Sequence, residues 1–242
     1  MTRTLIPLAA AFFAGSALAD HRAIEVTDRG TFIPGVRLGV DMAPRGEAPA
    51  VPHSGHGFEL GFTGASGDAS QNRTPGAPAL VFGGRTFAAP VELHHDYDFR
   101  FAEVAYRYRH FFGEGTFGIE ALGGLGYAQY ELTVTSAAQR ASEKLSSGGL
   151  VGGFGILWKF LPQTSLQSRV TVFGSGDGEG VSAAARLDVF IAQALGRNAA
   201  VRMGLTSWGL VSSREENDDF SSLNSQILAS FSGLALQLEL AF

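Results

Sequence analysis

Hydrophobic and polar residues alternate at every second position along most of this chain. In the closing segment, residues 233–242, Leu234, Leu236, Leu238 and Leu240 alternate with small or polar residues. A period of two is typical of a β-strand with one apolar face. The same period recurs in segments that begin near residues 36, 58, 104, 117, 150, 166, 181 and 201. The pattern therefore predicts an all-β chain.

The two faces of these strands differ in charge. The apolar face has no charged residue, and the opposite face carries Arg37, Asp41, Glu59, Glu103, Arg107, Arg109, Glu120, Lys159, Arg169, Arg186, Asp188, Arg202 and Glu239. An unpaired buried charge costs several kcal/mol, so enclosed charges must form pairs. These are seven cations and six anions, close to balance. We expect a structural plug of ion pairs, with a charge-lined pore or a proton or ion switch as alternatives.

Alternation alone also fits a soluble β-sandwich, so strand length and the N-terminus must discriminate. The segments are roughly 10–16 residues long, whereas strands of soluble proteins are mostly about 5–6 and membrane-spanning strands need about 9–11. Residues 1–19 have one cation, an apolar stretch and the sequence Ala17-Leu18-Ala19. This arrangement predicts a cleaved secretory signal peptide. Residues 20–242 then form a single domain.

The connections alternate in length. Residues 112–115, 161–165 and 195–200 form short turns, whereas the connections at 133–147, 174–180 and 212–222 are mostly longer and more polar. Short periplasmic turns and long external loops are typical of outer-membrane barrels, which place both termini in the periplasm when the number of strands is even. Seven strands are expected from residue 98 onward, and 31–42, 55–64 and 80–87 are further candidates. We predict eight strands, with ten as the alternative.

The leader, the period-two strands, the unequal loops and the terminal "LALQLELAF" together resemble small bacterial outer-membrane β-barrel proteins of the OmpA, OmpX and opacity-protein type. The resemblance implies a closed antiparallel transmembrane β-barrel surrounded by outer-membrane lipid and lipopolysaccharide. It also implies that Leu236, Leu238, Leu240 and Phe242 form the signal read by the barrel-assembly machinery. We expect a monomer with a structural or surface-interaction role, without cofactor or catalysis.

Composition narrows the possible chemistry further. The chain has no cysteine, which excludes disulfides, thiol nucleophiles and Cys-bound metals, and its net charge of −5 offers no basic face for nucleic acid. The segment "HHDYD", residues 94–98, is the best candidate for acid–base chemistry at the barrel rim. We expect it to be a solvated rim segment at an external loop, with no catalytic residue and no metal. A rim enzyme acting on lipid or peptide, and a narrow diffusion channel, are the competing hypotheses.

Overall fold

The protein is built from β-strands. The computed structural model describes residues 24–42, 52–113, 115–176, 180–214 and 225–241, and no helix occurs in this part of the chain. The expected signal peptide, residues 1–19, and Phe242 lie outside the described residues. Within those ranges there is thus no helix long and apolar enough to cross a membrane.

Twelve strands follow one another along the described chain. They are β1 (Ile24–Arg29), β2 (Ile33–Asp41), β3 (Gly55–Arg73), β4 (Leu80–Phe82), β5 (Arg85–Phe87), β6 (Val91–Phe112), β7 (Phe117–Thr135), β8 (Arg140–Leu161), β9 (Thr164–Gly174), β10 (Gly180–Ala194), β11 (Ala199–Arg214) and β12 (Ser225–Ala241).

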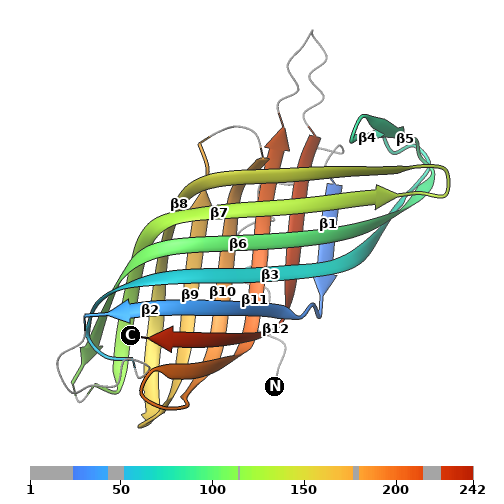
Figure 1. The fold of residues 1–242 in the computed structure, drawn as a ribbon. Helices are drawn as coiled ribbons and strands as arrows, with labels where there is room; N and C mark the ends of the chain where they lie inside the picture. The colour runs from blue at the N-terminus through green and yellow to red at the C-terminus, as the bar shows by residue number, and fades with distance from the viewer. Residues whose placement is uncertain (1–23, 43–51, 114, 177–179, 215–224, 242) are drawn as a thin grey trace.

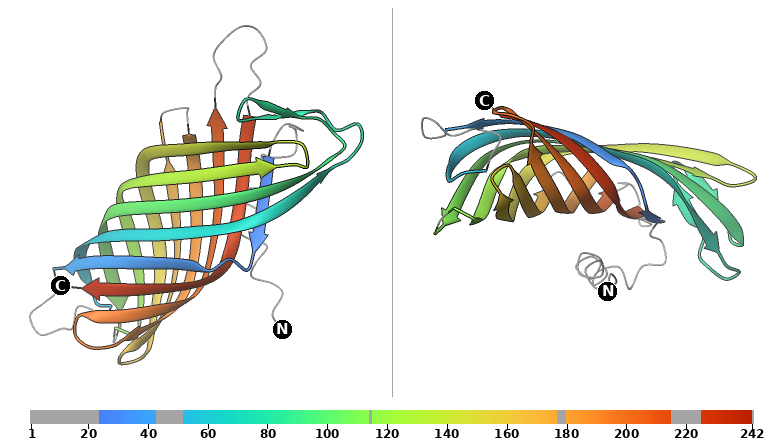
Figure 2. Two further views of the ribbon diagram at one scale, coloured as in Figure 1. Left: turned by 45° about the vertical axis from the view of Figure 1, so that its right-hand side comes forward. Right: turned by 90° about the horizontal axis from the view of Figure 1, so that it is seen from below.

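Ten of these strands form one sheet that rings round on itself (Figures 1 and 2). From β2 through β3 and β6 to β12, each strand pairs with the next in antiparallel fashion. The ring is completed by β12, which pairs in parallel with β2 over Ala235–Ala241 and with β1 over Ile227–Ser232. β1 and β2 thus run along β12 as one strand interrupted at Gly30, whose φ of 108° suits glycine.

The closure differs from the sequence prediction in strand number and direction. Residues 33–41 and 55–73 both lie in the wall, and the sheet has ten strands in nine wall positions, because β1 and β2 share one position along β12. Eight strands were preferred from the sequence, and the alternative of ten counted the segment near residues 80–87 in place of β1. The segment near residues 80–87 instead forms a separate hairpin, β4–β5. The prediction assumed antiparallel closure, which requires an even number of strands. Parallel closure accepts an odd number, and it places the start of β1 and the end of β12 at opposite ends of the ring.

Side chains that point outward from the ring are apolar and exposed. Phe58, Leu60 and Phe62 on β3 are about half exposed, as is Val104 on β6. The same holds on the other strands for Leu38, Leu125, Phe154, Val172, Ile191, Met203, Leu236 and Leu238. The face that the sequence predicted to be apolar therefore forms the exterior of the ring.

One bulge changes the face of a predicted residue. The pairing of β10 with β11 shifts register between Val181 and Ala183. Val181 is fully buried, although the alternation of Leu187, Val189 and Ile191 predicts that it faces outward with them. A bulge adds one residue to a strand, and this reverses the faces of the residues before it.

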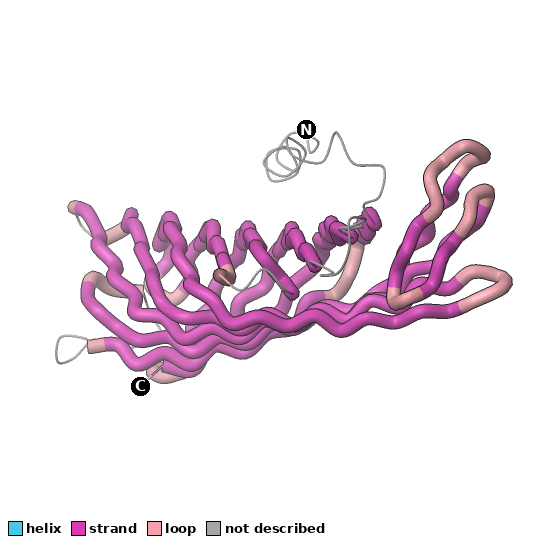
Figure 3. Tube along the Cα trace, turned by 90° about the horizontal axis from the view of Figure 1, so that it is seen from above, coloured by secondary structure: helices cyan, strands magenta, loops and turns pink. Residues whose placement is uncertain are grey.

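Four strands continue beyond the ring as a four-stranded extension, which we define as residues 64–73 of β3, 91–100 of β6, 128–135 of β7 and 140–149 of β8 (Figure 3). Its outward positions are mostly polar. Its inner face carries Leu93, Leu132 and Leu145, which are buried in one cluster with the hairpin residues Leu80, Phe82 and Phe87. The hairpin β4–β5 therefore shares a small apolar core with the extension.

Candidate functional site: the ionic interior

The charged face of the strands lies inside the ring. Eleven of the thirteen charged residues identified in the sequence are at most 5% exposed: Arg37, Glu59, Glu103, Arg107, Arg109, Glu120, Arg169, Arg186, Asp188, Arg202 and Glu239. The Asp41 side chain is 6% exposed and belongs to the same group. Lys159 is half-buried, and its Nζ lies 4.4 Å from the centre of the Phe111 ring.

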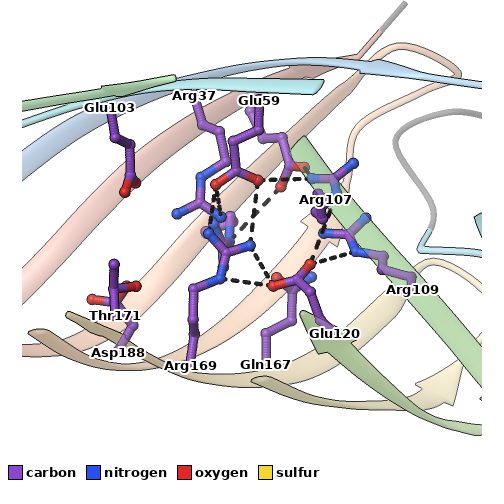
Figure 4. Close-up of polar contacts among 12 residues, drawn as sticks. Arg37, Glu59, Glu103, Arg107, Arg109, Glu120, Gln167, Arg169, Thr171 and Asp188 are labelled. Carbon is purple, nitrogen blue, oxygen red and sulfur yellow. Dashed lines mark hydrogen bonds and ion pairs between the residues drawn. The ribbon is translucent and has the colours of Figure 1, made fainter. Parts of the chain in front are cut away.

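Arg169 of β9 joins strands on opposite parts of the wall (Figure 4). Its Nη1 lies 2.5 Å from Oε1 of Glu59 on β3, and its Nε donates to Oε1 of Glu120 on β7 at 2.7 Å. Its Nη2 also contacts Glu120. Because an arginine fork donates in a fixed plane, these bonds fix the positions of two carboxylates on two distant strands.

Further arginines complete the shell around the same carboxylates. Arg107 donates from Nη1 to Glu59 Oε2 at 2.9 Å and also bonds to Asp41. Arg109 donates from Nε to Glu120 Oε2 at 2.6 Å. Arg37 Nη1 lies 3.3 Å from Glu59 Oε1. Each of the two central carboxylates is therefore held by several arginines, which compensates for its removal from water.

A second group of ion pairs is built on Arg186 of β10. Its Nη2 donates to Glu103 Oε1 at 2.8 Å, and its Nε lies 2.9 Å from Asp188 Oδ2. Thr206 donates to the other oxygen of Asp188 at 2.9 Å. The Arg186 guanidinium also lies 5.1 Å from the Trp208 ring centre. A cation over an aromatic face is attracted by the ring quadrupole, so this arginine connects the ionic and aromatic parts of the interior.

Arg202 of β11 is held less closely. Its Nε lies 3.8 Å from Glu239 Oε2, and its Nη1 donates to Gln237 Oε1 at 3.2 Å. Its guanidinium lies 4.9 Å from the Phe190 ring centre. The ionic interior as a whole therefore contains six arginines and six carboxylates, with a formal charge of zero when Lys159 is left out.

Glycines on the wall leave room for these long side chains. A Cβ placed on Gly61 would lie 2.9 Å from Glu103 Oε1 and 3.0 Å from its Cγ, so a larger residue here would displace this carboxylate.

An aromatic layer lies next to the ion pairs, and sequence reasoning missed it. Phe99, Phe101, Trp208 and Phe231 are at most 2% exposed and contact one another, with Phe101 and Trp208 edge to face at 5.0 Å. On β6 these rings share the parity of Glu103, so the period-two pattern does contain the signal. The prediction considered only the charged members of this face.

Beyond the aromatic layer, β1 is bonded to the wall. Tyr97 donates from its hydroxyl to Asp28 Oδ2 at 2.8 Å, and Thr31 donates to the same oxygen at 2.5 Å. Burial and the neighbouring Asp28 raise the pKa of Tyr97. These bonds join the interruption between β1 and β2 to β6.

The candidate acid–base segment, residues 94–98, lies within strand β6 and not in a loop, contrary to the sequence expectation. Successive residues of a strand face opposite ways, so His94 and Asp96 are exposed while His95 is completely buried. Neither ring nitrogen of His95 has a hydrogen-bond partner among the described residues. Burial, aided by nearby His94, lowers the pKa of His95 to about 4 against an opposing effect of Asp96. The two histidines therefore do not form a joint site.

No group of three or more His, Asp or Glu residues in the described ranges is placed to hold a metal ion.

Comparisons with known proteins give no further assignment. A scan against protein-family models finds no matching family. Searches against curated proteins and against solved structures find no match either.

Proposed function

We propose that the protein is an outer-membrane β-barrel with a structural or surface-interaction role and an interior plugged by ion pairs. The observation that carries this proposal is the reversal of the usual polarity: charged side chains are enclosed, and apolar ones are exposed all round the ring. Hydrocarbon around the ring stabilises such an exterior, because in water these apolar side chains would stay exposed at a cost in free energy. A ring of paired strands also leaves few backbone groups without hydrogen bonds, which lipid requires.

The height of the apolar exterior fits a bilayer. On β6 the outward positions from Ala102 to Phe112 are apolar apart from His110, and above them come Glu92, His94, Asp96, Asp98 and Arg100. Eleven residues cover about 36 Å of strand, which at a tilt near 45° spans roughly 25 Å. This supports a lipid-spanning ring, with the four-stranded extension standing in water on one side.

Aromatic side chains gather at the opposite border of the exterior. Trp158 and Phe160 lie 5.7 Å apart near the end of β8, and Phe112 stacks on Phe117 across the turn from β6 to β7 at 6.2 Å. Aromatic residues are enriched where the bilayer meets water. This border is next to the short turns, which supports a periplasmic position for them.

The enclosed ion pairs favour a plug over a channel. Arg107, Glu59 and Arg169 are at most 3% exposed, and their bonds cross from one part of the wall to another. Charged groups held in pairs do not supply a continuous water path. The extension and the loops would accordingly make the surface contacts, including those with lipopolysaccharide.

Heat-modifiable migration tests this proposal. The protein should fractionate with outer membranes, require detergent for extraction, and migrate differently on a denaturing gel before and after boiling. A folded barrel resists the detergent of the gel until it is heated, and this shifts its mobility. Recovery of the folded protein in the aqueous fraction without detergent would contradict the proposal.

A further inference from the structure

The wall of the ring lacks a backbone ladder along one side of β1. β2 pairs with β12 on one side and with β3 on the other, over Gly35–Asp41. β1 pairs with β12 from Ile24 to Arg29. Among the described residues no backbone pairing joins β1 to residues 64–73 of β3, although the two strands lie in contact. We call this boundary between β1 and β3 the seam.

The side chain of Asp28 bridges the seam. Asp28 lies on β1, and its Oδ2 accepts hydrogen bonds from the hydroxyl of Tyr97 on β6 at 2.8 Å and from that of Thr31 at 2.5 Å. The two hydroxyl oxygens are 3.0 Å apart. Tyr97 and Thr31 are 4% and 7% exposed, so water competes little for these bonds. We call Asp28, Tyr97 and Thr31 the latch.

Gly67 provides the passage for this carboxylate across β3. It lies directly opposite Tyr97 in the pairing of β3 with β6. A Cβ on Gly67 would lie 2.9 Å from the Tyr97 hydroxyl oxygen and would collide with the Asp28 carboxylate. Any larger residue at this position would therefore push Asp28 out of the latch.

The seam separates an apolar interior from a polar rim. Ile24 and Val26 of β1 are at most 1% exposed and belong to the same buried cluster as Tyr97, which stacks on Phe231 at 5.4 Å. The exposed residues that alternate with the inner ones along the seam are polar: Glu25, Thr27 and Arg29 on β1, and Ser66 and Asp68 on β3. Side-chain bonds, in place of a backbone ladder, keep this apolar cluster closed at the side of the ring.

We propose that β1 is a strap that closes the wall beside the extension, and that the latch holds this strap shut. β1 has six residues and pairs with β12 alone, so its release breaks one short ladder and the latch. β2 keeps its pairings with β12 and β3, and the rest of the ring stays closed. Such local openings need less free energy than unfolding of the whole protein. Release of β1 opens the wall sideways between β12 and β3 and uncovers the apolar cluster.

This inference goes beyond the proposed function and does not depend on it, because the latch bonds are the same whether lipid or water surrounds the ring.

Hydrogen–deuterium exchange of the full protein in detergent micelles, followed by mass spectrometry of peptides, tests the strap. Tyr97→Phe removes only the hydroxyl that donates to Asp28. Exchange of the β1 amides should become at least about tenfold faster, as expected for the loss of one hydrogen bond to a charged group, while exchange in β9 and β10 stays unchanged.

Tyr130→Phe is the matched control for Tyr97→Phe. Tyr130 is fully buried on β7 and stacks with Tyr97 at 6.3 Å, but its hydroxyl has no hydrogen-bond partner within the described part of the chain. Its replacement should leave exchange in β1 unchanged.

Gly67→Ala tests the latch from the other strand, with Gly64→Ala as its control. A Cβ on Gly64 would lie 3.6 Å from the carbonyl oxygen of Phe99, which is an ordinary contact. Gly67→Ala should speed exchange in β1 as Tyr97→Phe does, and Gly64→Ala should not.

Three outcomes would overturn the proposal. The first is unchanged β1 exchange in Tyr97→Phe or in Gly67→Ala. The second is an equal increase in the Tyr130→Phe control. The third is an increase that extends equally to β9 and β10, or loss of the folded form, since either would show that these bonds hold the whole ring together and not a separable strap.

Discussion

Arg169 shows how single side chains hold the interior of this ring together. It bonds to Glu59 and Glu120, which belong to strands on different parts of the wall. Its removal would leave two buried carboxylates with fewer cations, and the loss of one partner from a buried ion pair typically costs about 3–5 kcal/mol. The other arginines around these carboxylates explain why the expected loss lies at the lower end of that range.

We predict that Arg169→Met lowers the free energy of unfolding by about 3 kcal/mol. Arg197→Met is the matched control, since Arg197 is exposed in the turn between β10 and β11 and its loss should change stability little. Urea-induced unfolding in detergent micelles, followed by tryptophan fluorescence, measures both. Equal stability of the two variants would show that the ion pairs contribute little.

His95 gives the extension a predicted pH dependence. Its pKa is about 4 in the folded protein and about 6.5 when exposed, so the unfolded segment binds more protons between these values. The contribution of the neutral, buried His95 imidazole to stability is complete above pH 6.5 and is lost as the pH falls toward 4. Protease cleavage of the β4–β5 hairpin should accordingly increase over this range.

His95→Leu should remove that increase, because leucine places an apolar side chain at this buried position and has no titrating group. His94→Leu is the control, since His94 is exposed on the opposite face and its replacement should leave the pH profile of cleavage intact. A profile unchanged by His95→Leu would assign the acid sensitivity to another group.

At the scale of elements, the closing pairing of β12 depends on one glycine. A Cβ on Gly233 would lie 1.7 Å from the carbonyl oxygen of Thr31, beside the interruption between β1 and β2. Gly233→Val should therefore prevent β12 from pairing along its full length with these strands. We predict a marked loss of the compact, unboiled form on a denaturing gel.

Gly152→Val is the matched control for that substitution. Its Cβ would face outward and meet only the Val172 side chain at 3.9 Å, an ordinary contact. The compact form should persist in this variant. Equal loss in both variants would show that the effect does not depend on the close approach to Thr31, and would remove the specific role of Gly233.

The period-two pattern predicted the faces of the strands well, because each strand has one side enclosed. Arg107, Arg186 and Arg202 are buried, and Leu236 and Leu238 are exposed, as the alternation requires. The bulge at Val181 could not be predicted, since it depends on the pairing of β10 with β11. Parallel closure and the nine wall positions were also missed, because pairing between the first and last strands leaves no local signal.

At the scale of the whole molecule, the plugged interior predicts the absence of steady conductance. Purified protein inserted into a planar bilayer should show no persistent channel if the buried arginines and carboxylates, which bond from strand to strand, plug the ring as proposed. Long-lived, uniform current steps that persist in several independent preparations would support the channel hypothesis instead. Insertion should be verified in the same membranes by protection from protease.

The central claim is that hydrocarbon contacts the apolar exterior while the ionic face lies inside, and the two tryptophans of the chain test it directly. Trp158 is 49% exposed on the outer face, whereas Trp208 is 2% exposed inside the ring. The measurement is fluorescence quenching by lipids brominated near the headgroup end of their acyl chains, using Trp208→Phe and Trp158→Phe to isolate each residue. We predict strong quenching of Trp158 and little of Trp208. Quenching of Trp158 by aqueous iodide but not by brominated lipid would contradict the account.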